Sequence, residues 1–114
     1  MKYLALLGCL IAMALGLLGA CAPRRAALFV SVEPKGRTGV SEMRATYGGL
    51  FLGMGLTGLL LQDKAAFAVA AACWCGAAVL RAVSVFLDQN FYSKNLRAIG
   101  VEGVIGALFA VGAF

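Results

Sequence analysis

The sequence predicts an all-α fold, a bundle of four transmembrane helices, and three observations predict it. The chain is 62% hydrophobic and 13% charged, whereas soluble domains are about half apolar and about a quarter charged. Four apolar runs each approach the roughly 17–25 residues that a spanning helix needs. These runs show little period-2 alternation, which speaks against the strands of a membrane barrel. Because the backbone in hydrocarbon must bond to itself, we expect helices, arranged as a single four-span domain over residues 1–114.

The first expected helix covers residues 3–22, and it has to be distinguished from a signal sequence. The segment "LGAC", which ends at Cys21, resembles a bacterial lipoprotein cleavage box. Cleavage there would make Cys21 a lipidated N-terminus. The apolar run is about 20 residues long, however, against about 7–15 for a signal core. Arg24 and Arg25 follow at once, and positive charge resists translocation. We therefore expect a retained helix, with a lipoprotein anchored at Cys21 as the less favoured alternative.

The remaining helices are expected at residues 44–61, 65–87 and 97–114. Ser41 fits the N-cap of the second helix, since a serine oxygen can accept a bond from a free backbone N–H. The connection "QDK" is short, so the second and third helices should form an antiparallel hairpin. The first loop contains "AALFVSVEP", which is apolar enough to lie on the membrane interface or to pack under the bundle.

Basic residues in the loops predict the orientation in the membrane. Lys2 and Lys64 fall on one side, and seven basic residues fall on the other: Arg24, Arg25, Lys35, Arg37, Arg44, Lys94 and Arg97. The positive-inside rule then places the first and third loops in the cytoplasm. The sequence thus predicts a multi-pass protein of the bacterial inner membrane with both termini in the periplasm.

Two ionised side chains, Arg81 and Glu102, lie inside apolar runs, where each costs about 2.5–3.5 kcal/mol on the insertion scale. At 1.5 Å per residue both lie roughly 7–9 Å from the same surface, and Arg44 and Tyr47 fall in that leaflet. Glu102 should bond Arg81, Arg44 or both, because a forked guanidinium matches a carboxylate. We therefore predict one polar cluster, structural or ligand-binding, made of Arg44, Tyr47, Arg81, Ser84, Asp88 and Glu102.

Three roles for this cluster stay open at this point. It could be a structural clasp that fixes the helix order, since pairing removes the cost of burial. It could be a site that opens to the cytoplasmic face and takes an anionic lipid headgroup or a small molecule with a carboxylate or a quinone-like carbonyl. It could also serve a small proton-coupled transporter that uses Glu102.

Composition argues against several other classes. The chain has no histidine, and no metal-ligand set or nucleophile motif is apparent, so we expect no catalytic residue, no metal and no cofactor, and a membrane enzyme is the less favoured reading. The net charge of +5 follows from topology, so we expect membrane lipid and not nucleic acid as the partner. The four cysteines are expected to be buried packing thiols.

Glycines are dense in the second and fourth helices. Small residues let helix backbones approach closely in lipid, where no hydrophobic force drives helices together. We expect this packing role within the chain, with a homo-oligomer face as the alternative, for Gly48, Gly49, Gly53, Gly103 and Gly106.

Three segments together resemble a known family. They are "RATYGGLFLGMGL", "LRAVSVFLDQ" and "VEGVIGAL", and the chain is similar over nearly its whole length to the bacterial membrane proteins grouped as domain of unknown function 4345. The family pattern has a glycine after the aspartate, where this chain has Gln89. The resemblance implies a four-helix membrane protein and no particular activity. Its recurring polar and glycine positions match Arg44, Tyr47, Gly48, Gly49, Arg81, Ser84, Asp88 and Glu102.

Overall fold

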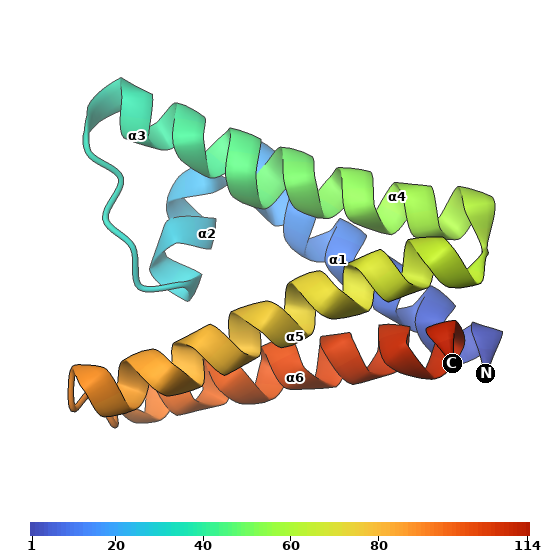
Figure 1. Cartoon of the computed structure of the whole chain (residues 1–114). Coiled ribbons are helices and arrows are strands. Elements are labelled where there is room, and N and C mark those ends of the chain that lie inside the picture. The colour runs from blue at the N-terminus through green and yellow to red at the C-terminus, as the bar shows by residue number, and fades with distance from the viewer. The chain divides into compact units, whose positions relative to one another are not determined.

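The computed structural model describes residues 1–114, and its elements are all helices joined by loops, which confirms the all-α class (Figure 1). The chain divides into two compact units, one formed by Met1–Gly8 with Leu61–Phe114 and the other by Cys9–Leu60, and each is described by itself. In chain order the elements are α1 (Lys2–Cys21), α2 (Pro23–Phe29), α3 (Gly36–Met43), η1 (Arg44–Leu50), α4 (Phe51–Leu61), α5 (Lys64–Leu87) and α6 (Ser93–Ala113).

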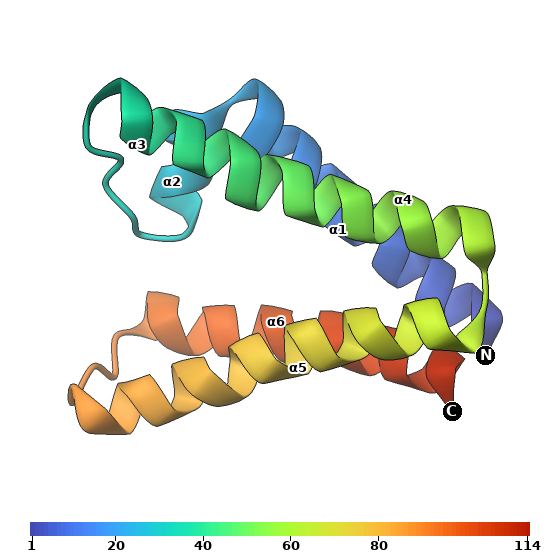
Figure 2. The ribbon, with the colours of Figure 1, turned by 45° about the horizontal axis from the view of Figure 1, so that its top comes forward.

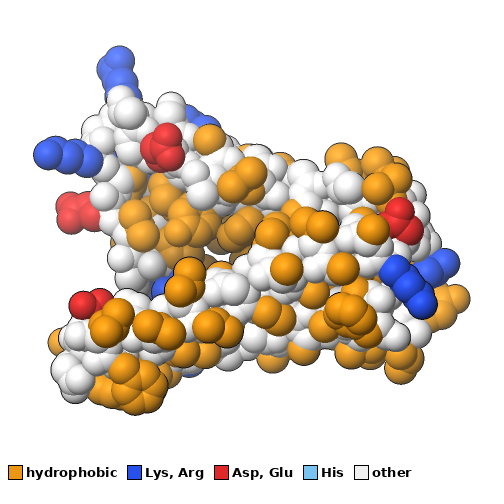
Figure 3. All heavy atoms as spheres, in the orientation of Figure 1, with side chains coloured by type: hydrophobic (Ala, Val, Ile, Leu, Met, Phe, Trp, Pro, Cys, Tyr) orange, Lys and Arg blue, Asp and Glu red, His pale blue; other side chains and the backbone are white.

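Three helices, α1, α5 and α6, are long and apolar enough to cross a membrane. Large apolar side chains on their surfaces are exposed, among them Val79, Leu80 and Phe86 on α5 and Val104 on α6. Figure 3 shows hydrophobic side chains spread along the outer surface of α5. A soluble domain seldom exposes so much contiguous apolar area. The finding fits a membrane protein.

The second expected span is helical but differs from the prediction. Residues 44–61 form two pieces, the seven-residue π-helix η1 and the eleven-residue α4, and neither piece alone has the length of a span. Backbone angles at Met43 and Phe51 are helical, so the chain continues without interruption from Gly36 to Leu61. The helix begins at Gly36, directly after Lys35, and Ser41 therefore lies inside α3 and is not its N-cap.

In the unit that contains the C-terminus, α5 and α6 form a hairpin and lie side by side in both views (Figures 1 and 2). The helix α6 begins at Ser93, earlier than the expected residue 97. Phe67 and Phe109 pack between these helices with ring centroids 6.4 Å apart. Residues Met1–Gly8 belong to the same unit, and a Cβ built on Gly8 would lie 3.3 Å from Cε2 of Phe109.

In the other unit, α1 runs antiparallel to η1 and α4 at backbone contact distance. A Cβ built on Gly19 would lie 2.6 Å from the nitrogen of Gly48, and one built on Gly16 would lie 2.6 Å from the nitrogen of Leu52. Further along, a Cβ on Gly55 would lie 2.6 Å from the carbonyl oxygen of Cys9. The contacting positions 48, 52 and 55 recur at helical spacing on one face. One face of η1 and α4 therefore lies against the backbone of α1 along this whole stretch.

The five glycines predicted to pack differ in what surrounds them within the chain. Gly48 packs against Ala20 and Gly106 packs against Cys75. A side chain on Gly53 or Gly103 would meet nothing within 4 Å, and one on Gly49 would reach only the Arg44 carbonyl oxygen at 4.0 Å. Adjacent residues on a helix point about 100° apart, so the pair 49 and 53 faces away from the stripe formed by 48, 52 and 55.

The cysteines also depart from expectation. Cys9 is buried, but Cys21, Cys73 and Cys75 are exposed. Cys75 still contacts α6, since its Sγ would lie 2.6 Å from a Cβ built on Gly106. An exposed thiol such as that of Cys73 is apolar enough to face lipid as a small hydrophobic group. The prediction that all four thiols are buried was therefore wrong for three of them.

Candidate polar site in the α5–α6 hairpin

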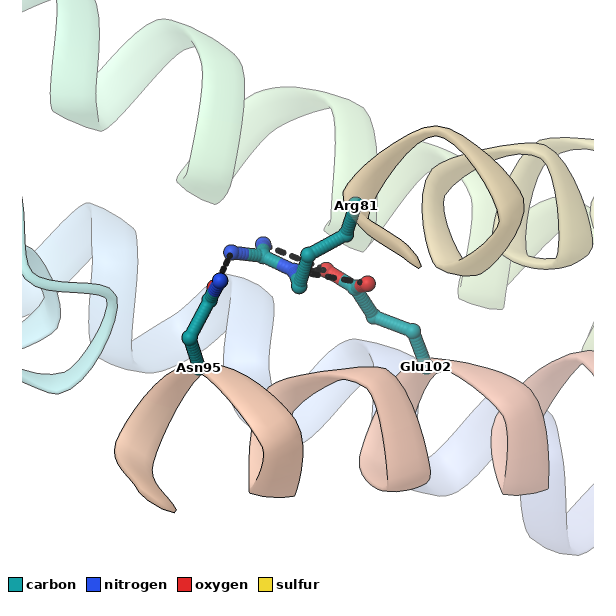
Figure 4. Close-up of polar contacts among 3 residues, drawn as sticks. All are labelled: Arg81, Asn95 and Glu102. Atoms are coloured by element: carbon teal, nitrogen blue, oxygen red, sulfur yellow. Dashed lines mark hydrogen bonds and ion pairs between the residues drawn. The ribbon is translucent and has the colours of Figure 1, made fainter. Parts of the chain in front are cut away.

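The centre of the candidate site is a side-on pair between Arg81 of α5 and Glu102 of α6 (Figure 4). Nε of Arg81 donates to both carboxylate oxygens, at 3.1 Å to Oε1 and 2.9 Å to Oε2. Nη2 of Arg81 donates to Oε1 at 2.6 Å. Parallel charge-assisted bonds of this kind fix both the distance and the orientation of the two groups. The pair therefore links two helices at positions 21 residues apart in the sequence.

A third residue, Asn95, completes the contact. Nη1 of Arg81 donates to Oδ1 of Asn95 at 3.2 Å, and Figure 4 shows the guanidinium lying between Asn95 and Glu102. Sequence reasoning missed Asn95 because it fell in the expected third loop. A signal was available, since Asn95 precedes Glu102 by seven residues and that spacing places both on one face of a helix.

Burial of the pair is unequal. The side chain of Glu102 is 13% exposed, whereas that of Arg81 is 31% exposed. An isolated carboxylate in this position would be costly, and a paired one with hydrogen bonds to both oxygens is not. Arg81 and Glu102 together carry no net charge. The pair by itself therefore offers no surplus of positive charge to an anion.

Two more members of the predicted cluster interact locally at the end of α5. Oγ of Ser84 donates to Oδ2 of Asp88 at 3.1 Å, and both residues are exposed. Asp88 is the C-cap of α5, and its backbone N–H donates to the Ser84 carbonyl oxygen. This pair lies toward the α5–α6 loop from Arg81, and it caps the helix end.

The last two members, Arg44 and Tyr47, lie on η1 in the other unit. Arg44 is exposed. The Tyr47 ring packs edge-to-face on Phe51 with centroids 5.6 Å apart, and Tyr47 also borders a buried cluster that contains Ala27 and Met43. The approach of Arg44 and Tyr47 to Glu102 stays a prediction.

The π-helix η1 is a feature that the sequence did not predict. It coincides with "RATYGGL", which lies in the first of the three segments that carry the family resemblance. π-helical turns inside α-helices are rare and occur frequently at functional sites. Here the wide turn includes Gly48, where α1 and η1 touch backbone to backbone.

Comparison with known proteins identifies the family. The model of a family described as "Domain of unknown function (DUF4345)" matches residues 1–113. No curated protein and no solved structure matches the chain. Because the match covers almost every residue, the chain belongs to the family of domain of unknown function 4345.

Proposed function

We propose that the chain is a four-span protein of the bacterial inner membrane, with α1, η1 with α4, α5 and α6 as its spans. The pieces η1 and α4 run on from one another, and Arg44 at their beginning is their only charged residue. In this placement the basic first and third loops lie in the cytoplasm and both termini lie in the periplasm. The exposed apolar side chains on α5 and α6 support lipid contact.

We further propose that the chain acts as a structural membrane module and not as an enzyme, and that Arg81, Glu102 and Asn95 form a clasp that locks the α5–α6 hairpin. One observation carries this: Arg81 donates to both oxygens of Glu102. A carboxylate engaged in this way has its charge balanced within the chain, and the pair gains nothing further from a bound cation or proton.

The competing functions are binding of an anionic lipid or small molecule and proton-coupled transport through Glu102. Protonation of Glu102 would leave the Arg81 charge without its partner inside a span, which is costly. Binding of an anion at Arg81 would have to compete with the bonds to Glu102 at 2.6–3.1 Å. Both alternatives therefore require that the clasp open.

The test is a double-mutant cycle on the full chain in lipid nanodiscs, with thermal unfolding as the readout. Glu102→Met and Arg81→Met each leave one charge unpaired, and each should lower stability by about 2–4 kcal/mol. The double variant removes both charges and keeps the volume, so it should recover most of the loss. Ser84→Ala removes a polar group from the same end of α5 and serves as the control with little effect.

The same variants separate the functions. A clasp predicts recovery in the double variant. A double variant that stays as unstable as either single variant would contradict it. Loss of a proton-driven flux in vesicles by a well-folded Glu102→Gln protein would establish transport instead. An anionic lipid that co-purifies with the parent and is lost from a stable Arg81→Leu protein would establish a binding site.

A further inference from the structure

The short helix α2 packs by one face only. Pro23, Ala26 and Ala27 are buried, and the two alanines form a cluster with Met43, bordered by Tyr47. These positions recur at spacings of three and four, as expected for one face of a helix. Figure 1 shows the chain leaving the axis of α1 into α2 and then returning along α3. The helix is therefore held on the end of its unit by small residues.

The opposite face of α2 exposes basic side chains in its first turn and apolar side chains in its second. Arg24 and Arg25 are exposed. One turn later Leu28 is 71% exposed and Phe29 is 57% exposed. Each apolar residue lies four positions after an arginine, so Arg24 is followed by Leu28 and Arg25 by Phe29 on the same arc. Val32, just beyond the helix, is exposed as well. The surface is thus basic at one end and apolar at the other.

The positive charge of this segment is not balanced by the chain. Between residues 22 and 40 there are four basic residues and one acid, Glu33. Neither Arg24 nor Arg25 forms an ion pair with an acid of the chain. Figure 3 shows further basic side chains projecting beside α3. The segment therefore has the charge complementary to an anionic partner.

We propose that α2 and the turn after it dock onto the anionic lipid headgroups of the leaflet where α1 ends. Cys21 ends α1 and Pro23 begins α2, so α2 starts at the depth where the span leaves the hydrocarbon. Arg24 and Arg25 meet the phosphates, and Leu28 and Phe29 enter the boundary of the acyl chains. Basic residues combined with exposed apolar ones are the mark of interfacial segments. The inference rests on the membrane placement proposed above and is independent of the Arg81–Glu102 clasp.

The first experiment measures lipid affinity. The full chain in detergent is titrated with phosphatidylglycerol or phosphatidylcholine, and the bound lipid is counted by native mass spectrometry. The Arg24→Gln/Arg25→Gln variant should weaken phosphatidylglycerol binding by roughly fivefold or more, because the proposed binding surface then loses both of its positive charges. Phosphatidylcholine binding should not change. The matched control, Lys2→Gln/Lys64→Gln, removes the same charge from residues outside α2 and should keep the parent affinity. An equal loss in both variants, or in neither, would overturn the proposal.

The second experiment measures depth and does not depend on removing charge. In a Trp74→Phe background, Phe29→Trp fluorescence should be quenched by phosphatidylglycerol brominated on its acyl chains in reconstituted vesicles. Val79→Trp in the same background reports on a site that is 60% exposed in the second half of α5. Quenching at position 79 without quenching at position 29 would refute lipid docking, and it would indicate that an acidic protein segment or a second copy covers α2. Quenching at neither position would overturn the membrane placement itself.

Discussion

Gly19 and Gly48 touch backbone to backbone, since a Cβ built on Gly19 would lie 2.6 Å from the Gly48 nitrogen. A side chain at Gly19 must therefore push α1 away from η1. We expect Gly19→Leu to destabilise the fold by about 1–3 kcal/mol, as overpacking at a close helix contact does. Thermal unfolding of the protein in nanodiscs measures the loss.

The matched control for that substitution is Gly53→Leu. Nothing lies within 4 Å of a Cβ at Gly53, so the added side chain should be tolerated, and the better helix propensity of leucine should leave stability equal or slightly higher. Equal destabilisation by both substitutions would show that the contact between α1 and η1 does not limit stability. A loss of stability in the Gly53→Leu protein alone would indicate an oligomer that uses this face of the helix.

Gln89 occupies a backbone position that favours glycine. Its φ is 52°, and it follows Asp88 at the end of α5, where the Asn90 N–H donates to the Val85 carbonyl oxygen at 2.9 Å. This 6→1 bond is the mark of a helix end closed by a left-handed residue. Gln89→Gly should therefore stabilise the hairpin by about 0.5–1 kcal/mol, measured as a rise in the unfolding temperature.

A β-branched residue at position 89 should have the opposite effect on stability. Gln89→Val should lower the unfolding temperature, because a branched side chain is strained at positive φ. The side-chain bond from Gln89 Nε2 to the Phe86 carbonyl oxygen at 2.9 Å is exposed, so its loss in either variant should contribute little. If glycine and valine shifted stability in the same direction, backbone strain would not be the cause.

Asp63 caps the start of α5. Its Oδ1 accepts a bond from the Ala66 N–H at 2.7 Å, which satisfies one of the backbone donors at the helix end. Asp63→Ala should cost about 1 kcal/mol in unfolding free energy, and Asp63→Asn should keep most of the stability because asparagine caps equally well. A large loss with asparagine would indicate that the charge of Asp63 matters more than the cap.

The pairing of Arg81 with Glu102 could be anticipated because depth in a membrane follows directly from residue count. A fixed rise per residue and alternating helix directions were enough to place the two charges at the same level. The close stripe between α1 and η1 could not be anticipated in the same way. Helix rotation depends on which faces pack, and the sequence offered glycines on several faces of the same helix. Of the predicted Gly48, Gly49 and Gly53, it is Gly48 that makes the contact, together with Gly55 further along.

The π-helix η1 escaped prediction for a related reason. A π-turn adds one residue per turn and has no distinctive composition. The segment "RATYGGL" was therefore predicted to form the first turns of an ordinary α-helical span. The extra residue changes which face each later side chain occupies. The start of α6 at Ser93 was likewise hidden, because "SKN" is polar and the expected helix was defined by its apolar run.

Substitution of Asn95 tests whether Arg81 belongs to a polar network of three residues or only to an ion pair with Glu102. Its Oδ1 accepts the bond from Nη1 of Arg81 at 3.2 Å, and a neutral acceptor for a charged donor contributes about 1–2 kcal/mol when partly buried. Asn95→Ala should lower the unfolding free energy by this amount in the parent protein. In the Arg81→Met/Glu102→Met background the same substitution should have almost no effect, because its donor is gone. A double-mutant cycle of unfolding free energies gives the coupling directly. Equal losses in the two backgrounds would show that Asn95 acts on the first turn of α6 and not through Arg81, and the clasp would then consist of two residues.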